Sequence, residues 1–350
     1  MILRRIRARA PLRLGFAGGG TDVSPYCDEF GGVSFNATID LFAHVTLETR
    51  ADGQVELSAE DRQETWCGTA EAELPTVEPL RLLKGVYNRC IREFFGGRPQ
   101  AVTLTSYADC PPGSGLGTSS ALVVAMVRAF AELADVTLSP ARLARLAFEI
   151  ERVDLGLAGG RQDQYAAAFG GFNFMQFLTD DSVVIEPVEV APDVLRELEA
   201  SLVLYFTGVS RESATIIEQQ ASNMRRHDAR SLDGLHALKA AGYEMRDALA
   251  AGDLQSFGAL LDAGWEAKKK TADRISSGAI DEVMRAAESY GVWGAKVSGA
   301  GGGGFIMFLV EATRREGLKR FLAQHGGEVM GAKFIASGVE SWRAQARLAA

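Results

Sequence analysis

The feature that most constrains this chain is a loop of glycine, hydroxyl and proline residues that runs directly into a helix-forming segment. Residues 111–120 read Pro-Pro-Gly-Ser-Gly-Leu-Gly-Thr-Ser-Ser and are followed by Ala-Leu-Val-Val-Ala-Met. Gly113, Gly115 and Gly117 let backbone N–H groups turn inward where a Cβ atom would block them. The helix adds unpaired N–H groups and the positive end of its dipole. We therefore predict that the loop binds a polyanion, most often the phosphate chain of a nucleotide.

This loop matches neither of the two commonest nucleotide-binding loops. It lacks the lysine of a Walker A loop, and Thr118 stands where a G-x-G-x-x-G motif needs its last glycine. Ser119 and Ser120 start the expected helix, where a hydroxyl can cap the helix or bind Mg²⁺. Capping alone is the alternative for either serine, and a plain strand-to-helix turn is the alternative for the loop.

Length and charge limit the possible partners. The chain has 350 residues, 47% hydrophobic and 23% charged, which is enough for two globular domains with their own cores. A net charge of −8 argues against a nucleic-acid partner. An anionic substrate would therefore need locally placed cations.

Cysteine spacing and the N-terminus indicate a reduced protein without a membrane partner. The four cysteines, Cys27, Cys67, Cys90 and Cys110, have no CxxC spacing and no paired histidines near them. The sequence therefore suggests neither a zinc site nor a disulfide framework. Proline, arginine and glycine residues interrupt the apolar stretch behind the basic start, so no signal segment is expected. Since no apolar run has the length of a membrane span, we expect a soluble, cytoplasmic protein.

The order of elements predicts an α+β fold with a domain boundary between residues 180 and 192. Strand patterns occur at 4–16, 34–49, 53–57, 101–107, 201–207, 292–297, 305–310 and 328–335. Helical patterns occur at 80–95, 119–134, 140–152, 213–227, 232–251, 254–270, 280–290 and 313–325. Ser139 before Pro140 is typical of a helix N-cap. The closing strand–glycine–strand–helix–strand order predicts an antiparallel sheet backed by helices.

A second segment, residues 10–22, ends an expected strand in three glycines, Thr21 and Asp22. The glycines at 18–20 permit a ligand to approach the backbone closely. Asp22 has the chemistry to accept hydrogen bonds from sugar hydroxyls. A hairpin turn with an Asx cap is an equally good interpretation of this segment alone.

A third segment holds two groups of acids. Glu149, Glu151 and Arg152 end one expected helix, and a glycine-bearing loop then leads to Arg161 and Asp163. One carboxylate could bind Mg²⁺ beside phosphates, and another could accept the proton of an attacking hydroxyl. For any single acid, a surface ion pair with a neighbouring arginine is the simpler alternative.

The fourth segment is the glycine run of residues 296–305. Its glycines formally match G-x-G-x-x-G, but a strand and not a helix follows, which excludes a dinucleotide-binding motif. Two interpretations of this segment remain. It is either a flexible hinge or a backbone lining that closes on substrate and phosphate.

Taken together, residues 10–22, 111–121 and 296–305 resemble the three motifs of the GHMP kinases, in the same order. The resemblance spans residues 8 to about 310. It implies a two-domain fold, with a ribosomal protein S5 domain 2-like N-terminal domain (residues 1–185) that binds ATP and Mg²⁺. A ferredoxin-like α+β C-terminal domain (residues 186–350) would follow it.

The resemblance also implies residue roles. Asp163 would be the catalytic aspartate, and Arg13 the basic residue of the first motif. Mg²⁺ would be bound by Ser119 and Glu151, although one residue more than in the family pattern separates Glu151 from the aspartate. ATP would be bound by Pro112, Gly113, Ser114, Gly115, Leu116, Gly117, Thr118, Ser119 and Ser120.

A finer resemblance is to the branch of the family that phosphorylates heptose 7-phosphate at its anomeric hydroxyl, for nucleotide-heptose and surface polysaccharide synthesis. It extends to Ser-Pro-Tyr at 24–26, Gly-Leu-Ala-Gly-Gly-Arg-Gln-Asp-Gln at 156–164 and Thr-Gly-Val-Ser-Arg at 207–211. The sugar phosphate would contact Gly19, Gly20, Thr21, Asp22, Arg161, Arg211, Gly301 and Gly302.

Several alternatives stay open at this point. The lysines at 268–270 are candidates for the sugar phosphate, but a solvated helix face is the favoured interpretation of this run. A kinase for another sugar such as fucose, or a non-catalytic sensor on the same fold, remains possible from the sequence. A homodimer is compatible with it.

Overall fold

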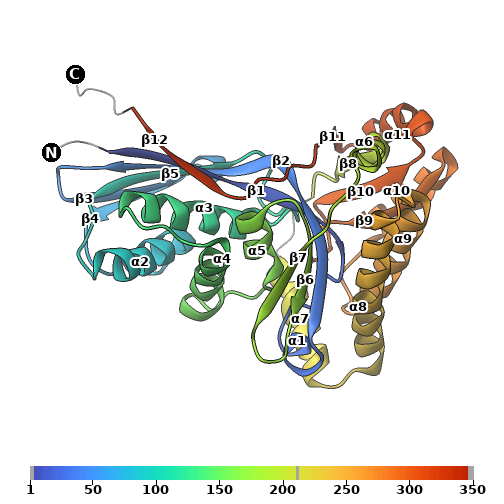
Figure 1. Ribbon diagram of the computed structural model, residues 1–350, viewed down its shortest axis with the longest axis horizontal. Coiled ribbons are helices and arrows are strands. Elements are labelled where there is room, and N and C mark those ends of the chain that lie inside the picture. Colours follow the sequence, from blue (N-terminus) through green and yellow to red (C-terminus); the bar gives the residue numbers. More distant parts are fainter. Residues whose placement is uncertain (1–3, 210–212, 346–350) are drawn as a thin grey trace.

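A large sheet organises the N-terminal half of the chain (Figure 1). The computed structural model describes residues 4–209 and 213–345. Strands β12 (Glu340–Ala344), β1 (Arg5–Ala17), β2 (Gly32–Thr49), β5 (Val102–Ala108), β3 (Gln54–Ala59) and β4 (Glu64–Thr69) follow one another across the sheet. Strand β2 also pairs with β6 (Phe172–Phe177), and β6 pairs with β7 (Val183–Pro187).

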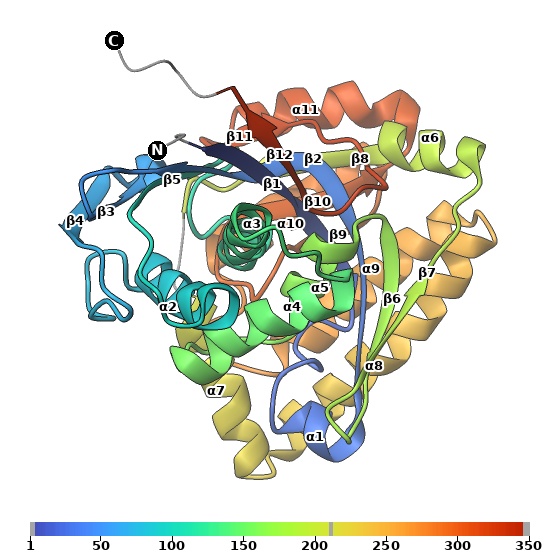
Figure 2. The same cartoon turned by 60° about the vertical axis from the view of Figure 1, so that its left-hand side comes forward.

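Helices cover one face of this sheet, and α3 lies at their centre (Figure 2). They are α2 (Arg81–Phe95), α3 (Thr118–Leu133), α4 (Pro140–Phe148) and α5 (Gln162–Phe169), while the short α1 (Tyr26–Phe30) follows the first strand. Helix α3 is apolar nearly all round and is buried against the first two strands, as expected of a core helix. Ser139 caps α4, since its side chain accepts the N–H of Arg142 at 3.2 Å, which confirms the predicted start.

A smaller antiparallel sheet organises the second half, with strand order β11 (Glu328–Met330), β8 (Leu202–Phe206), β10 (Phe305–Val310) and β9 (Val292–Val297). The helices of this half are α6 (Pro192–Ser201), α7 (Ser213–Arg225), α8 (Ala229–Ala250), α9 (Leu254–Lys269), α10 (Gly278–Ala287) and α11 (Arg315–Ala323). The predicted antiparallel sheet backed by helices is confirmed, and so is the α+β class.

Two predicted elements end earlier than expected. The last strand of the small sheet stops at Met330, because the chain then crosses to the large sheet, where Phe334 bridges to Ile39. The helix predicted to reach Arg152 ends as an α-helix at Phe148 and continues as a π-helical turn, Glu149–Asp154. Short 3₁₀ turns cover Glu60–Arg62, Glu288–Tyr290 and Ala312–Arg314.

The end of the chain returns to the N-terminal sheet. Strand β12 pairs antiparallel with β1, and the two described ends of the chain lie on the same side of the molecule (Figure 1). The division into residues 1–185 and 186–350 therefore stays a proposal, to which this returning strand has to be added. Among the described residues, every helix is too short or too polar to span a membrane.

Candidate active site

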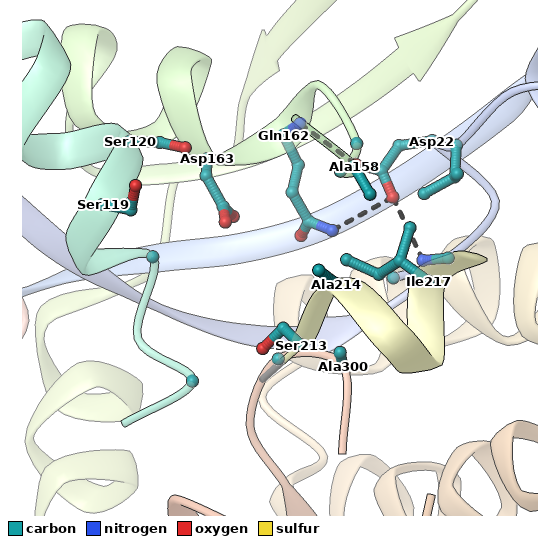
Figure 3. A pocket seen from close by; sticks show the side chains of 18 of the residues that line it. Asp22, Ser119, Ser120, Ala158, Gln162, Asp163, Ser213, Ala214, Ile217 and Ala300 are labelled. Carbon is teal, nitrogen blue, oxygen red and sulfur yellow. Dashed lines mark hydrogen bonds between the residues drawn. The ribbon is translucent and has the colours of Figure 1, made fainter. Parts of the chain in front are cut away.

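All four sequence segments contribute residues to the lining of one cavity of about 340 Å³. Figure 3 shows Ser119 and Asp163 toward one end of this cavity and Asp22 toward the other. Helix α7 faces them with Ser213, Ala214 and Ile217. The cavity therefore lies where the two halves of the chain meet.

The glycine-rich loop forms one wall and is bonded to the first strand. The backbone N–H of Arg13 donates to the carbonyl of Leu116 at 3.0 Å, and the Arg13 guanidinium donates to the carbonyl of Gly115 at 2.5 Å. Gly117 is the N-cap of α3 and has a φ of 77°, in the left-handed region that favours glycine. The loop thus delivers the N-terminal end of α3, with its free N–H groups, to the cavity.

The loop residues differ in what they present to the cavity. Ser119 is exposed and lines it, whereas the buried Ser120 accepts a hydrogen bond from the Gln164 amide at 3.1 Å. The Ser114 hydroxyl is bonded to the Cys110 thiol at 3.1 Å. Pro112 and Leu116 are not among the lining residues, and the lining part of the loop consists of Gly113, Ser114, Gly115, Gly117, Thr118, Ser119 and Ser120.

Asp163 and Arg13 form an ion pair beside the loop. One Asp163 oxygen accepts a hydrogen bond from Arg13 Nε at 2.8 Å and lies 2.8 Å from Arg13 Nη2. Asp163 lies in the first turn of α5, where the helix dipole also stabilises a carboxylate. A Cβ atom on Gly117 would lie 3.3 Å from Asp163 Cγ and 3.5 Å from Arg13 Cγ. A glycine at this position lets the glycine-rich loop, the Asp163 carboxylate and the Arg13 guanidinium come into direct contact.

The two glutamates of the third segment have different surroundings. Glu149 forms ion pairs with Arg145 at 3.0 Å and Arg89 at 2.5 Å, and it does not line the cavity. Glu151 lines the cavity with only 1% of its surface exposed. It accepts the Gln164 amide at 2.5 Å, and its nearest cation, Arg152, is 3.7 Å away.

The surroundings of Glu151 fit a divalent cation. A buried carboxylate needs compensating charge, and here Arg152 supplies it only through a long ion pair of 3.7 Å, while the close hydrogen bond comes from a neutral amide. A carboxylate and the Ser119 hydroxyl are the hard oxygen donors that Mg²⁺ prefers, completed by water and substrate phosphate. In the described part of the chain, no group of three or more histidine, cysteine or acidic side chains is placed so that it could hold a metal ion.

Asp22 is positioned by four hydrogen bonds rather than free in the cavity. One oxygen accepts the backbone N–H groups of Arg161 and Gln162 at 2.9 and 3.1 Å, at the start of α5. The other accepts the N–H of Gly20 at 3.0 Å and the Gln162 side-chain amide at 3.1 Å (Figure 3). A carboxylate offers about four acceptor positions, so all are in use. Asp22 therefore has the capping role of the alternative interpretation, since its side chain accepts a backbone N–H group of its own turn.

Four residues expected to contact the sugar are not among those that line the cavity: Thr21, Arg161, Gly301 and Gly302. Thr21 is buried and bonds to the carbonyls of Gly18 and Val33, both at 2.8 Å. Arg161 pairs with Asp181 at 2.5 Å and stacks on Phe148 instead.

The glycine run of residues 296–305 contacts the glycine-rich loop through backbone atoms. Gly301 and Gly302 pack on Ile275, while Gly299 and Ala300 reach the lining. The Phe305 N–H donates to the Ser114 carbonyl at 3.0 Å, so the run supports the loop from behind. Arg211 lies outside the described residues.

Sequence reasoning misjudged Lys268. This lysine is 2% exposed, lines the cavity and donates to the Gly19 carbonyl at 2.8 Å, so the solvated face expected for residues 268–270 is wrong at this position. Burial lowers its pKa to about 8, which Asp22 opposes and Arg13 reinforces. The missed signal was helical spacing, since Phe257, Leu261 and Lys268 share the buried side of α9.

Comparison with known proteins identifies the family. The model for the GHMP kinases N terminal domain matches residues 81–171, and the model for the GHMP kinases C terminal matches residues 245–328. A Campylobacter jejuni protein named D-glycero-alpha-D-manno-heptose 7-phosphate kinase is 40% identical over 97% of this chain and 100% of that protein. The chain belongs to the GHMP kinase family.

Two further relatives show how far the similarity extends. A solved structure described as a D-glycero-D-manno-heptose 1-phosphate kinase from Bacteroides thetaiotaomicron has 41% identity and a TM-score of 0.82, covering 97% of this chain and 100% of that one. The bifunctional fucokinase/GDP-fucose pyrophosphorylase of Arabidopsis thaliana is 25% identical over 92% of this chain and 31% of its own length. Because its 40–41% identical relatives in the family are sugar kinases, this chain is a phosphotransferase with an alcohol group as acceptor, as expected from the sequence.

Proposed function

We propose that this GHMP kinase transfers the γ-phosphoryl group of ATP to the anomeric hydroxyl of D-glycero-D-manno-heptose 7-phosphate. The observation that carries the proposal is the contact between Asp163, Arg13 and the glycine-rich loop in one cavity. The 40% identical relative named as a heptose 7-phosphate kinase supports this sugar. The product would be heptose 1,7-bisphosphate.

The chain's own residues supply positioning and charge for this transfer. The triphosphate would lie against the N–H groups of residues 113–119, with the sugar hydroxyl at Asp163. The sugar hydroxyl oxygen forms a bond to the γ-phosphorus while the bond from the γ-phosphorus to the ADP oxygen breaks. The proton of that hydroxyl passes to the Asp163 carboxylate. Arg13 pairs with the Asp163 carboxylate and stabilises negative charge on the transferred group. Such catalysis depends mainly on alignment and electrostatics.

Ser119 and Glu151 are the residues that would hold Mg²⁺. When bound, the ion neutralises charge on the β- and γ-phosphates. Gln164 would hold the Glu151 carboxylate in place, since its amide donates to that carboxylate and to Ser120.

Replacing Ser119 with alanine tests the metal assignment. We expect Ser119→Ala to raise the Mg²⁺ concentration for half-maximal activity by about 10-fold, because one hard oxygen ligand is lost. Ser139→Ala is the matched control: it removes the N-cap of α4, costs about 1 kcal/mol of stability and leaves the Mg²⁺ dependence unchanged. Titration of activity against Mg²⁺ decides, and an unchanged midpoint for Ser119→Ala would contradict the assignment.

The proposed acceptor is tested by ADP release from a set of sugars. Heptose 7-phosphate should have the highest kcat/KM, well above heptose, fucose and galactose. Turnover of neutral hexoses without turnover of heptose 7-phosphate would favour the fucose-type alternative. ATP binding without ADP release on any sugar would indicate a non-catalytic protein.

A further inference from the structure

Two buried lysines of the second half reach the end of β1, and they differ in one respect. Lys296 of β9 donates to the carbonyls of Gly15 and Phe16 at 2.7 and 2.9 Å and does not line the cavity. Lys268 of α9 donates to the Gly19 carbonyl at 2.8 Å and does line it. Lys296 therefore links the two halves of the chain by hydrogen bonds, whereas the Lys268 ammonium is available to a ligand.

Among the described residues, three cationic side chains line the cavity. Arg13 is engaged by Asp163 and by the Gly115 carbonyl. Arg152 donates to the carbonyls of Leu157 and Ala158 and of Gly160, each at 3.3 Å. An ammonium group has three N–H donors, and one of those of Lys268 is directed to Gly19. Lys268 thus retains donor capacity for a bound anion.

The position of Lys268 indicates which anion it would meet. Its ammonium lies beside Gly19 and Gly20. Asp22, two residues further along, lies at the end of the cavity away from Ser119 (Figure 3). The triphosphate belongs to the Ser119 end, and the reacting hydroxyl belongs at Asp163. A group at the Asp22 end therefore contacts the part of the acceptor farthest from the transferred phosphoryl group.

We infer that Lys268 binds the phosphate that the acceptor already carries and so selects phosphorylated over unphosphorylated sugars. The inference rests on the proposed function, since it assumes that the acceptor occupies this cavity. Gln220 of α7, 3% exposed, lies beside Gly20 and lines the same cavity, with its amide nitrogen donating to the Thr271 hydroxyl at 2.5 Å. A phosphate would also compensate the charge of an ammonium that burial leaves poorly solvated.

The test compares Lys268→Gln with the matched control Lys270→Gln, which removes the same charge from an exposed position two residues along the chain. For each enzyme, kcat/KM is measured with heptose 7-phosphate and with unphosphorylated heptose, together with the Kd for ATP. We expect Lys268→Gln to reduce the ratio of the two kcat/KM values by about 10- to 100-fold. The ATP Kd should change by less than about 2-fold, and Lys270→Gln should behave as wild type.

A second variant separates recognition from a structural role. Lys268→Arg keeps the charge and should preserve the preference for heptose 7-phosphate, even where its absolute activity falls. An equal loss on both sugars in Lys268→Gln, with no change in their ratio, would show that Lys268 only supports the Gly19 carbonyl and would overturn the inference. A wild-type enzyme that prefers unphosphorylated heptose would contradict the proposed function itself.

The pH dependence gives an independent readout. The charged groups that face Lys268 are Asp22, which raises its pKa, and Arg13, which lowers it together with burial to about 8. Lys296 is the other cation close by. Because the ammonium loses its proton as pH rises through about 8, wild-type kcat/KM for heptose 7-phosphate should fall between pH 7 and 9. This fall should be absent in Lys268→Arg, and a fall that persists in that variant would contradict the inference.

Discussion

Replacing Asp163 with asparagine is expected to lower kcat by about 10³-fold or more while the Kd for ATP stays within about 3-fold. The substitution keeps the shape of the side chain and its place in the first turn of α5. It removes the charge that accepts the hydroxyl proton and that pairs with Arg13 at 2.8 Å. Steady-state kinetics with heptose 7-phosphate and calorimetric titration with ATP measure the two quantities.

The matched control for this variant is Asp193→Asn. Asp193 is an exposed aspartate in the first turn of α6, so it has the same helix-terminal position without the cavity. It should retain wild-type kcat. Near-native turnover in Asp163→Asn would remove Asp163 from the reaction, and loss of ATP binding in parallel would indicate a damaged loop instead.

Replacing Arg13 with methionine is expected to have the second largest effect, on both rate and stability. Its guanidinium joins Asp163 to the Gly115 carbonyl from a buried position in β1. Methionine fills similar space but leaves that carboxylate and that carbonyl without their donor. We expect kcat to fall by about 10²- to 10³-fold and the free energy of unfolding to fall by about 1.5 to 3 kcal/mol.

Arg9→Met is the control for Arg13→Met because Arg9 lies on the same strand but pairs with Glu340 at the surface. An exposed pair of this kind contributes at most about 1 kcal/mol, and kcat should not change. Urea denaturation and steady-state kinetics cover both readouts. If Arg13→Met matched Arg9→Met in both, the central ion pair would have no role in the reaction.

The sequence predicted the elements whose signals are local. Helix α3 and its glycine loop, the capped start of α4 and the strands β1, β9 and β10 all follow from residues close in sequence. The short β12 was missed because its five residues, Glu-Ser-Trp-Arg-Ala, are too few and too polar to give a strand signal, and the strand is held by its pairing with β1. Helix α5 was missed because three adjacent alanines in its eight residues give little periodicity.

The same distinction holds for the cavity. Lys268 contacts a carbonyl 249 residues away in sequence, and no local pattern reports that contact. Arg161 stands two residues from Asp163, which made it a candidate for the sugar phosphate, but its side chain points to Asp181 and Phe148. Proximity in sequence identified the segment correctly, and only the fold decides which of its side chains point into the cavity.

The central claim is that the glycine-rich loop holds the triphosphate while Asp163 faces the acceptor in the same cavity. A crystal structure with a non-hydrolysable ATP analogue and heptose 7-phosphate tests it most directly. We predict phosphate oxygens on the N–H groups of residues 113–119 and the anomeric hydroxyl within hydrogen-bond distance of Asp163. Phosphates bound elsewhere, or a sugar out of reach of Asp163, would contradict the claim.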